Sequence, residues 1–139
     1  MNLEDIYVGV ESVKKEESIK LFINKYLNNY KEESQYYEYP PFFGETEYET
    51  EDYKEMMSFV LKENGRSFRF YYESKENPEA PKGMIFINED GSVFLGLGVF
   101  SEFTSKYKTL LESDLQTSAV LICNEALPPE TFEEFKSLV

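Results

Sequence analysis

The turn sequence Asn-Glu-Asp-Gly at residues 88–91 lies between two apolar runs, 84–87 and 93–99, and constrains the fold more than any other feature. An Asp-Gly pair favours a tight turn, because glycine adopts positive φ angles at little cost. Such a turn between apolar runs is typical of a β-hairpin. The sequence therefore predicts two neighbouring antiparallel strands in the middle of the chain.

Other strands are predicted where apolar residues alternate with polar ones or form a short run, at 6–10, 67–73 and 119–123. Apolar residues at helical spacing predict helices over 19–30, 50–64 and 101–111, and a last short helix that begins near residue 128. The Pro40-Pro41 pair interrupts regular structure, because proline donates no hydrogen bond to a strand ladder. We expect a loop or an edge segment there.

The order of these elements predicts an α+β fold. We expect a mostly antiparallel sheet of about four to five strands with three to four helices packed against one face. Tight turns between successive strands favour the antiparallel arrangement. The 139 residues contain no repeat and no linker, so residues 1–139 are expected to form a single domain.

Gly96 and Gly98 lie two positions apart in the second strand of the predicted hairpin, so both leave the same face without a side chain. Glycine inside a strand often marks the close approach of another element. We expect a helix to pack closely against this face. The alternative is a ligand or the backbone of a partner.

The chain carries 27 acidic and 14 basic residues, a net charge of −13 at pH 7. A surface of this charge repels nucleic acid and anionic membranes, because contacts to phosphate groups need cations. Basic proteins are the favoured partners, although a high net charge also serves solubility alone. We expect neither a nucleic-acid nor a membrane partner.

The sequence contains no histidine, which bears on catalysis. Histidine is the usual general base, a common zinc ligand and the partner of most serine and cysteine nucleophiles. Paired carboxylates can also catalyse hydrolysis, but no pair stands in a recognisable motif, and residues 88–91 lack the calcium-loop pattern. We therefore expect a non-catalytic binding protein with no metal and no cofactor.

Residues 32–55, here called the acidic aromatic segment, contain nine acidic residues and one lysine. Acidic tails are usually poor in aromatic residues. This segment instead holds Tyr36, Tyr37, Tyr39, Phe42, Phe43, Tyr48 and Tyr53. Exposed rings among carboxylates favour a surface that binds a basic partner, and a solvated flank of the fold is the alternative. The predicted partner-binding residues are Tyr36, Tyr37, Glu38, Glu45, Glu47, Tyr48 and Glu49.

Arg66 and Arg69 are the only arginines of the chain and follow the acidic aromatic segment closely. The guanidinium group pairs well with carboxylates. We expect both arginines to pair with acidic residues of the segment and to hold it against the sheet.

The sequence holds few features that indicate the cellular compartment of the protein. Cys123 is the only cysteine, so no intramolecular disulfide is possible, and its apolar neighbours place it on a buried strand. Glu4 and Asp5 precede a short apolar run, the reverse of a signal peptide, and no apolar stretch approaches the roughly 20 residues of a membrane span. A cytoplasmic protein is expected.

Residues 83–135 resemble small acidic bacterial immunity proteins of polymorphic or contact-dependent toxin systems. The resemblance lies in Gly-Met-Ile-Phe-Ile, Asn-Glu-Asp-Gly-Ser and Leu-Gly-Leu-Gly-Val, then a helix, an apolar strand and Leu-Pro-Pro-Glu-Thr-Phe-Glu-Glu-Phe. It covers less than half of the chain and assigns no functional residue. It implies a cytosolic inhibitor that binds and neutralises a toxin domain, often a basic one. The alternatives are a general protein-interaction or scaffold domain and a phage-type nucleic-acid mimic.

Overall fold

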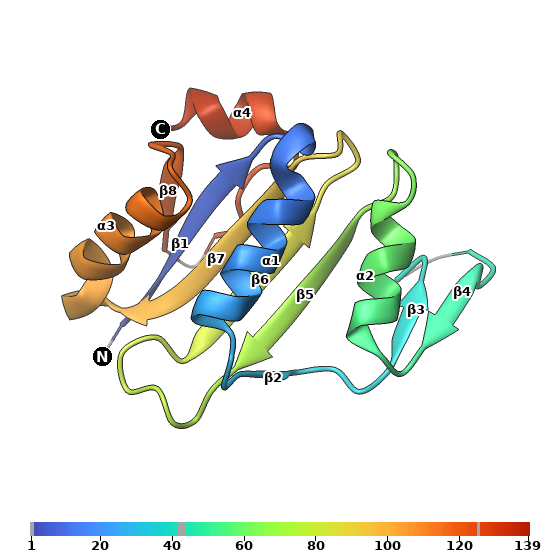
Figure 1. Ribbon diagram of the computed structural model, residues 1–139, viewed down its shortest axis with the longest axis horizontal. Coiled ribbons are helices and arrows are strands. Elements are labelled where there is room, and N and C mark those ends of the chain that lie inside the picture. Colours follow the sequence, from blue (N-terminus) through green and yellow to red (C-terminus); the bar gives the residue numbers. More distant parts are fainter. Residues whose placement is uncertain (1, 42–43, 125) are drawn as a thin grey trace.

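A six-stranded antiparallel sheet forms the centre of the molecule in a computed structural model, which describes residues 2–41, 44–124 and 126–139 (Figure 1). The strand order is β2-β5-β6-β7-β1-β8, with β2 and β8 at the edges. The strands of this sheet are β1 (Leu3–Val10), β2 (Lys31–Glu32), β5 (Phe68–Glu73), β6 (Lys82–Ile87), β7 (Val93–Phe100) and β8 (Val120–Cys123). The predicted α+β class and the antiparallel pairing are confirmed.

A second sheet of two short strands, β3 (Tyr37–Tyr39) and β4 (Tyr48–Thr50), lies beside the first. The helices are α1 (Lys15–Tyr26), α2 (Tyr53–Leu61), α3 (Thr104–Asp114) and α4 (Phe132–Ser137), with short 3₁₀ turns at Ser12–Lys14 and Ser101–Phe103. The described residues thus form more strands than the expected four to five. The additional ones are β2, which was not predicted, and β3 and β4, which flank the Pro40-Pro41 pair where a loop or an edge segment was expected.

The β6–β7 hairpin has the predicted geometry. Gly91 has a φ of +87° and its N–H donates to the Asn88 carbonyl oxygen at 3.0 Å. The Asn88 N–H donates to the Ser92 carbonyl oxygen at 2.9 Å, and Ile87 pairs with Val93 just inside the turn. The turn residues therefore set the register of the two central strands.

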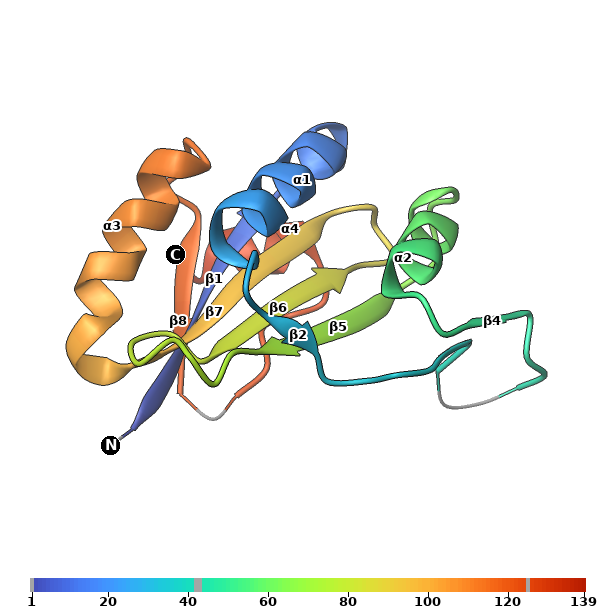
Figure 2. The same ribbon diagram turned by 60° about the horizontal axis from the view of Figure 1, so that its bottom comes forward.

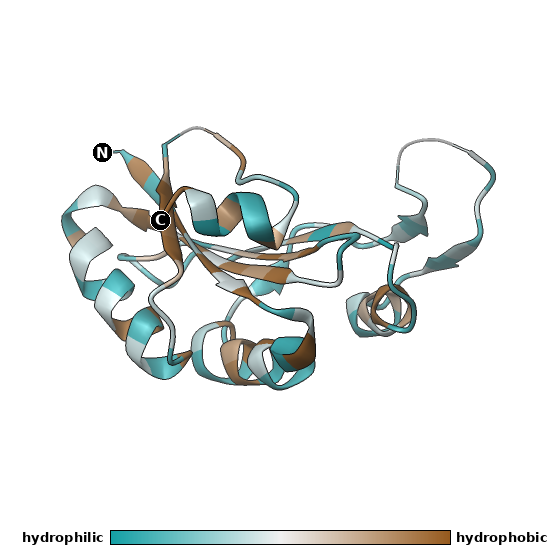
Figure 3. Ribbon diagram, turned by 90° about the horizontal axis from the view of Figure 1, so that it is seen from above, coloured by the Kyte–Doolittle hydropathy of each residue, from teal (hydrophilic) through white to brown (hydrophobic). Residues whose placement is uncertain are grey.

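Three helices cover one face of the six-stranded sheet and build the main core. Figure 3 shows α1, α2 and α3 on the same side, with α4 on the other. The main core joins Ile19 and Phe22 of α1, Met56 and Val60 of α2 and Leu111 of α3 to one face of the strands. The expectation that all helices pack on one face is therefore wrong for α4. Its short sequence contains too few apolar residues to show which face it covers.

The opposite face of the sheet has a smaller core that α4 closes. Phe135 of α4 is fully buried, and its ring centroid lies 4.5 Å from that of Phe94. Gly9 makes this approach possible, because a Cβ there would lie 2.7 Å from the Phe135 ring. Tyr7, Met84, Phe86 and Cys123 complete this core, so the predicted burial of Cys123 is confirmed.

The space above Gly96 is filled by side chains of the two neighbouring strands, β1 and β6, and not by a helix. A Cβ on Gly96 would lie 2.7 Å from Cδ1 of Tyr7 and 3.1 Å from Cε of Met84. At Gly98 the nearest atoms belong to Lys82 and Asp5. The predicted helix packing at these glycines is therefore wrong, because large side chains of adjacent strands lean across the vacant positions.

Gly96→Val is expected to lower the free energy of unfolding by about 1–3 kcal/mol, as overpacking of a filled core usually does. The Tyr7 ring is 1% exposed and has little room to move away from a new side chain. Urea denaturation of wild type and variant measures the difference. A variant with an unchanged midpoint would show that the ring moves aside freely, contrary to this packing.

Candidate functional site

Within the acidic aromatic segment, β3 and β4 form a hairpin that projects beyond the outer edge of β5 (Figure 2). In this hairpin Tyr37 pairs with Thr50, Glu38 with Glu49, and Tyr39 with Tyr48. Because side chains alternate along a strand, the tyrosines of β3 and β4 share one face and the glutamates share the other. The two residue types of the predicted site are thereby separated.

The inner face of the hairpin packs on α2 and β5. Tyr37 is only 4% exposed, and its ring centroid lies 5.7 Å from that of Phe70. Tyr48 is half-buried and stacks on Phe59, with ring centroids 4.4 Å apart. The expectation of exposed rings is therefore wrong for Tyr37 and only partly met by Tyr48. These rings anchor the hairpin to the fold.

The outer face of the hairpin carries the carboxylates. Glu38 and Glu49 lie directly opposite each other, and like charges in this position repel. Thr46 donates a hydrogen bond to Glu38, and the Tyr36 hydroxyl donates one to Glu49. That hydrogen bond to Glu49 raises the pKa of the Tyr36 hydroxyl to about 12. Both donors are neutral hydroxyls, so they do not balance the negative charge of Glu38 and Glu49 on this face.

Of the other predicted residues, Tyr36 is 50% exposed, and Glu45 and Glu47 are also exposed. Phe42 and Phe43 lie outside the described residues. Among the predicted tyrosines, Tyr36 therefore has the most exposed ring and is the one that a partner can contact.

A groove of about 690 Å³ lies between the start of the hairpin and the sheet. Side chains within 34–41, 67–71, 87–90 and 130–131 line it, and we call it the tyrosine groove. The structure brings three of the predicted residues to this groove, namely Tyr36, Tyr37 and Glu38. Glu45, Glu47, Tyr48 and Glu49 are not among its lining residues.

Sequence reasoning missed the other side of the tyrosine groove, which β5 and two distant loops provide. Tyr71 is 40% exposed and is held edge-on against Phe86, with ring centroids 5.5 Å apart. Glu89, Asp90 and Glu130 add carboxylates from the β6–β7 turn and the segment before α4. With Glu38, four carboxylates line the groove together with the two half-exposed tyrosines, Tyr36 and Tyr71. The sequence did hold a signal for this side, because side chains alternate along a strand and Arg69 and Tyr71 therefore share one face of β5.

The arginines do not pair with the acidic aromatic segment within the described residues. Arg69 forms an ion pair with Glu130 at 3.5 Å, and its guanidinium lies 5.3 Å from the centroid of the Phe86 ring. Arg66 lies 3.8 Å from the Phe59 ring centroid and pairs with Glu63 at 3.3 Å. The expected pairing is therefore wrong, because closer carboxylates and rings meet both side chains.

The outer edge of β5 also opens into the tyrosine groove. The Glu33 N–H donates to the Tyr71 carbonyl oxygen at 2.9 Å, so backbone groups of Tyr71 face this edge. Backbone groups alternate in direction along a strand, so those of Arg69 face the same edge. The pairing with β2 ends at Glu32 and Tyr72, and no ladder of the described residues extends to Arg69 on this side.

The Asp90 carboxylate accepts hydrogen bonds from two sides of the groove. One carboxylate oxygen accepts from the Ser92 N–H at 2.9 Å and from the Ser92 hydroxyl at 2.5 Å. The other accepts from the Phe132 N–H at 2.8 Å. Partial burial opposes ionisation, but these hydrogen bonds prevail and hold the pKa of Asp90 below its ordinary 3.8. The β6–β7 turn is thereby tied to the start of α4.

Asp90→Asn is expected to lower the free energy of unfolding by about 1 kcal/mol at neutral pH, because the amide has one acceptor oxygen where the carboxylate uses two. The pKa of Asp90 is lowered on folding, so its contribution is present above pH 3.8 and is lost as the pH falls through the folded-state value. Urea denaturation from pH 7 to pH 3 measures both proteins. The difference should shrink below about pH 4, and a constant difference would contradict this role.

The chain matches no protein-family model, no curated protein and no solved structure in the comparisons made. Among the described residues, no helix combines the length and apolar character that a membrane span requires. The same residues contain no group of three or more His, Cys, Asp or Glu side chains placed to hold a metal ion. The groove itself is therefore the basis for a functional assignment.

Proposed function

We propose that the chain is a non-catalytic, immunity-type inhibitor that acts in the cytoplasm and neutralises a basic toxin domain by binding it. The observation that carries the proposal is the tyrosine groove, where two half-exposed tyrosines stand among four carboxylates. Tyrosine is enriched among residues that dominate binding energy, and surrounding charges guide a partner of opposite sign. The resemblance of residues 83–135 to immunity proteins points to a toxin as that partner.

Charge supports a basic partner. The groove has four carboxylates and one arginine, and Arg69 is already paired with Glu130. Glu38 and Glu49 repel each other across the adjacent hairpin, and a cation from a partner would relieve this repulsion. The acids and the aromatic residues line one groove together, an arrangement that favours a protein partner over mimicry of a regular row of phosphates.

Affinity capture from the native host tests the proposal. The bait proteins are wild type, a groove variant with Tyr36→Ala and Glu89→Lys, and a control with Glu76→Lys, an exposed position away from the groove. We expect wild type and control to retain the same basic protein and the groove variant to lose it. Co-expression should then relieve the toxicity of the retained protein. An acidic or harmless retained protein, or equal retention by all three baits, would contradict the proposal.

A further inference from the structure

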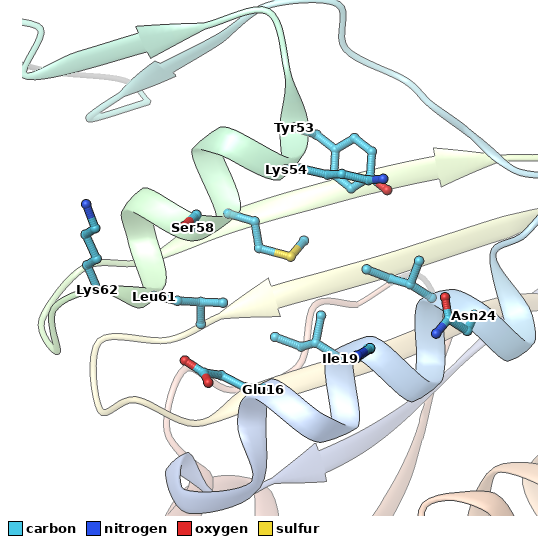
Figure 4. A pocket seen from close by; sticks show the side chains of 11 residues that line it. Glu16, Ile19, Asn24, Tyr53, Lys54, Ser58, Leu61 and Lys62 are labelled. Atoms are coloured by element: carbon cyan, nitrogen blue, oxygen red, sulfur yellow. The ribbon is translucent and has the colours of Figure 1, made fainter.

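A second groove, of about 440 Å³, lies between α1 and α2 on the helical face of the sheet. Its floor is apolar: Ile19 of α1 and Leu61 of α2 are directed toward each other across it (Figure 4), and Ile23 and Met57 also line it. We call it the helix groove. Its lining residues are all different from those of the tyrosine groove.

The charge of the helix groove is opposite to that of the chain. Lys20, Lys54 and Lys62 line it together with a single acid, Glu16. All three lysines are exposed, and none of them takes part in an ion pair with another described residue. The lining of this groove therefore contains three lysines without an ion-pair partner among the described residues, in a protein of net charge −13. This local reversal of charge selects an anionic partner.

The shape of the groove selects an elongated partner. It follows two helices, and the shorter one, α2, has nine residues and is about 14 Å long. An amphipathic helix of about three turns matches this length, and it places its apolar face in a hydrophobic groove with its charged residues at the rim.

We propose that the helix groove binds an acidic amphipathic helix of a second protein. The apolar seam of that helix covers Ile19, Ile23, Met57 and Leu61, and its flanking carboxylates pair with the three lysines. This inference does not depend on the proposed inhibitor function, because it concerns a separate surface of opposite charge.

Fluorescence anisotropy with two labelled helical 14-residue peptides tests the proposal at low salt. Both peptides carry leucine at i, i+3, i+4 and i+7, and the other positions hold mainly glutamate in one and lysine in the other. We expect the glutamate peptide to bind at least about tenfold more tightly than the lysine peptide, with an affinity that falls as salt is added. Equal affinities, or no binding of the glutamate peptide, would overturn the proposal.

Matched charge reversals locate the binding. Lys54→Glu with Lys62→Glu should weaken binding of the glutamate peptide by about tenfold or more. Lys14→Glu with Lys75→Glu makes the same change in net charge at exposed positions that do not line the groove and should leave the affinity nearly unchanged. Equal losses in the two variants would assign the effect to overall charge and overturn the proposal. If sodium laurate binds saturably and the glutamate peptide does not bind, the helix groove holds a single-chain carboxylate and the proposal is overturned. Circular dichroism confirms that each variant is folded.

Discussion

Phe135→Ala is expected to lower the free energy of unfolding by about 3–5 kcal/mol and the melting temperature by roughly 10–20 °C. Phe135 is fully buried and closes the second face of the sheet against Phe94 and Gly9. Its removal leaves a cavity that the strands cannot fill, because Gly9 has no side chain to move into it. Thermal and urea denaturation measure both changes.

Phe132→Ala is the matched control in the same helix. Phe132 is only partly buried, so its loss should cost clearly less. Equal effects of the two substitutions would indicate that α4 unfolds as a unit in both. A Phe135→Ala protein as stable as wild type would show that α4 is not required to close this core.

Tyr36→Ala is expected to speed dissociation of the retained partner by about 30-fold, the effect of losing roughly 2 kcal/mol at the centre of an interface. Tyr36 is half-exposed in the tyrosine groove, so its removal takes contact area from the partner and leaves the core intact. Tyr36→Phe keeps the ring and loses only the hydrogen bond to Glu49, so it should have a smaller effect. Surface plasmon resonance gives both rates.

Carboxylates of the groove should act on association instead. Glu38→Gln with Glu89→Gln should slow association and reduce its dependence on salt, because surface charges mainly steer the encounter. Glu45→Gln with Glu47→Gln removes the same charge outside the groove lining and should have a weaker effect. If the tyrosine and glutamate variants change the same rate constant to the same extent, Tyr36 does not lie at the centre of the interface with the glutamates at its edge, and this assignment is wrong.

The parts of the fold that sequence predicted well depend on local patterns. The β6–β7 hairpin followed from a glycine that adopts a positive φ, and the strand β5 followed from the alternation of residues 67–73. The first helix also lies where apolar residues recur at helical spacing, although α1 ends at Tyr26 and the pattern continues to Tyr30. In the folded chain the Tyr30 hydroxyl instead donates to the Ala80 carbonyl oxygen.

The parts that sequence did not predict depend on contacts between distant residues. Pro40 and Pro41 indicated a loop or an edge segment, and three residues are too few for the alternation that buries Tyr37 and exposes Glu38 to predict β3. The tyrosine groove joins this strand to Glu89 and Glu130, which are far along the chain. Composition could identify an acidic aromatic surface, but only the folded chain shows which rings are needed for its own core.

Amide hydrogen exchange of the protein, alone and bound to the retained partner, tests the central claim most directly. The account predicts slowed exchange in the complex at residues 34–38, 67–71 and 88–90, which line the tyrosine groove from three separate segments. Exchange at the helix groove should stay unchanged by this partner. Slowed exchange confined to α1, α2 or α3, with none at the tyrosine groove, would contradict the claim that this groove is the binding surface.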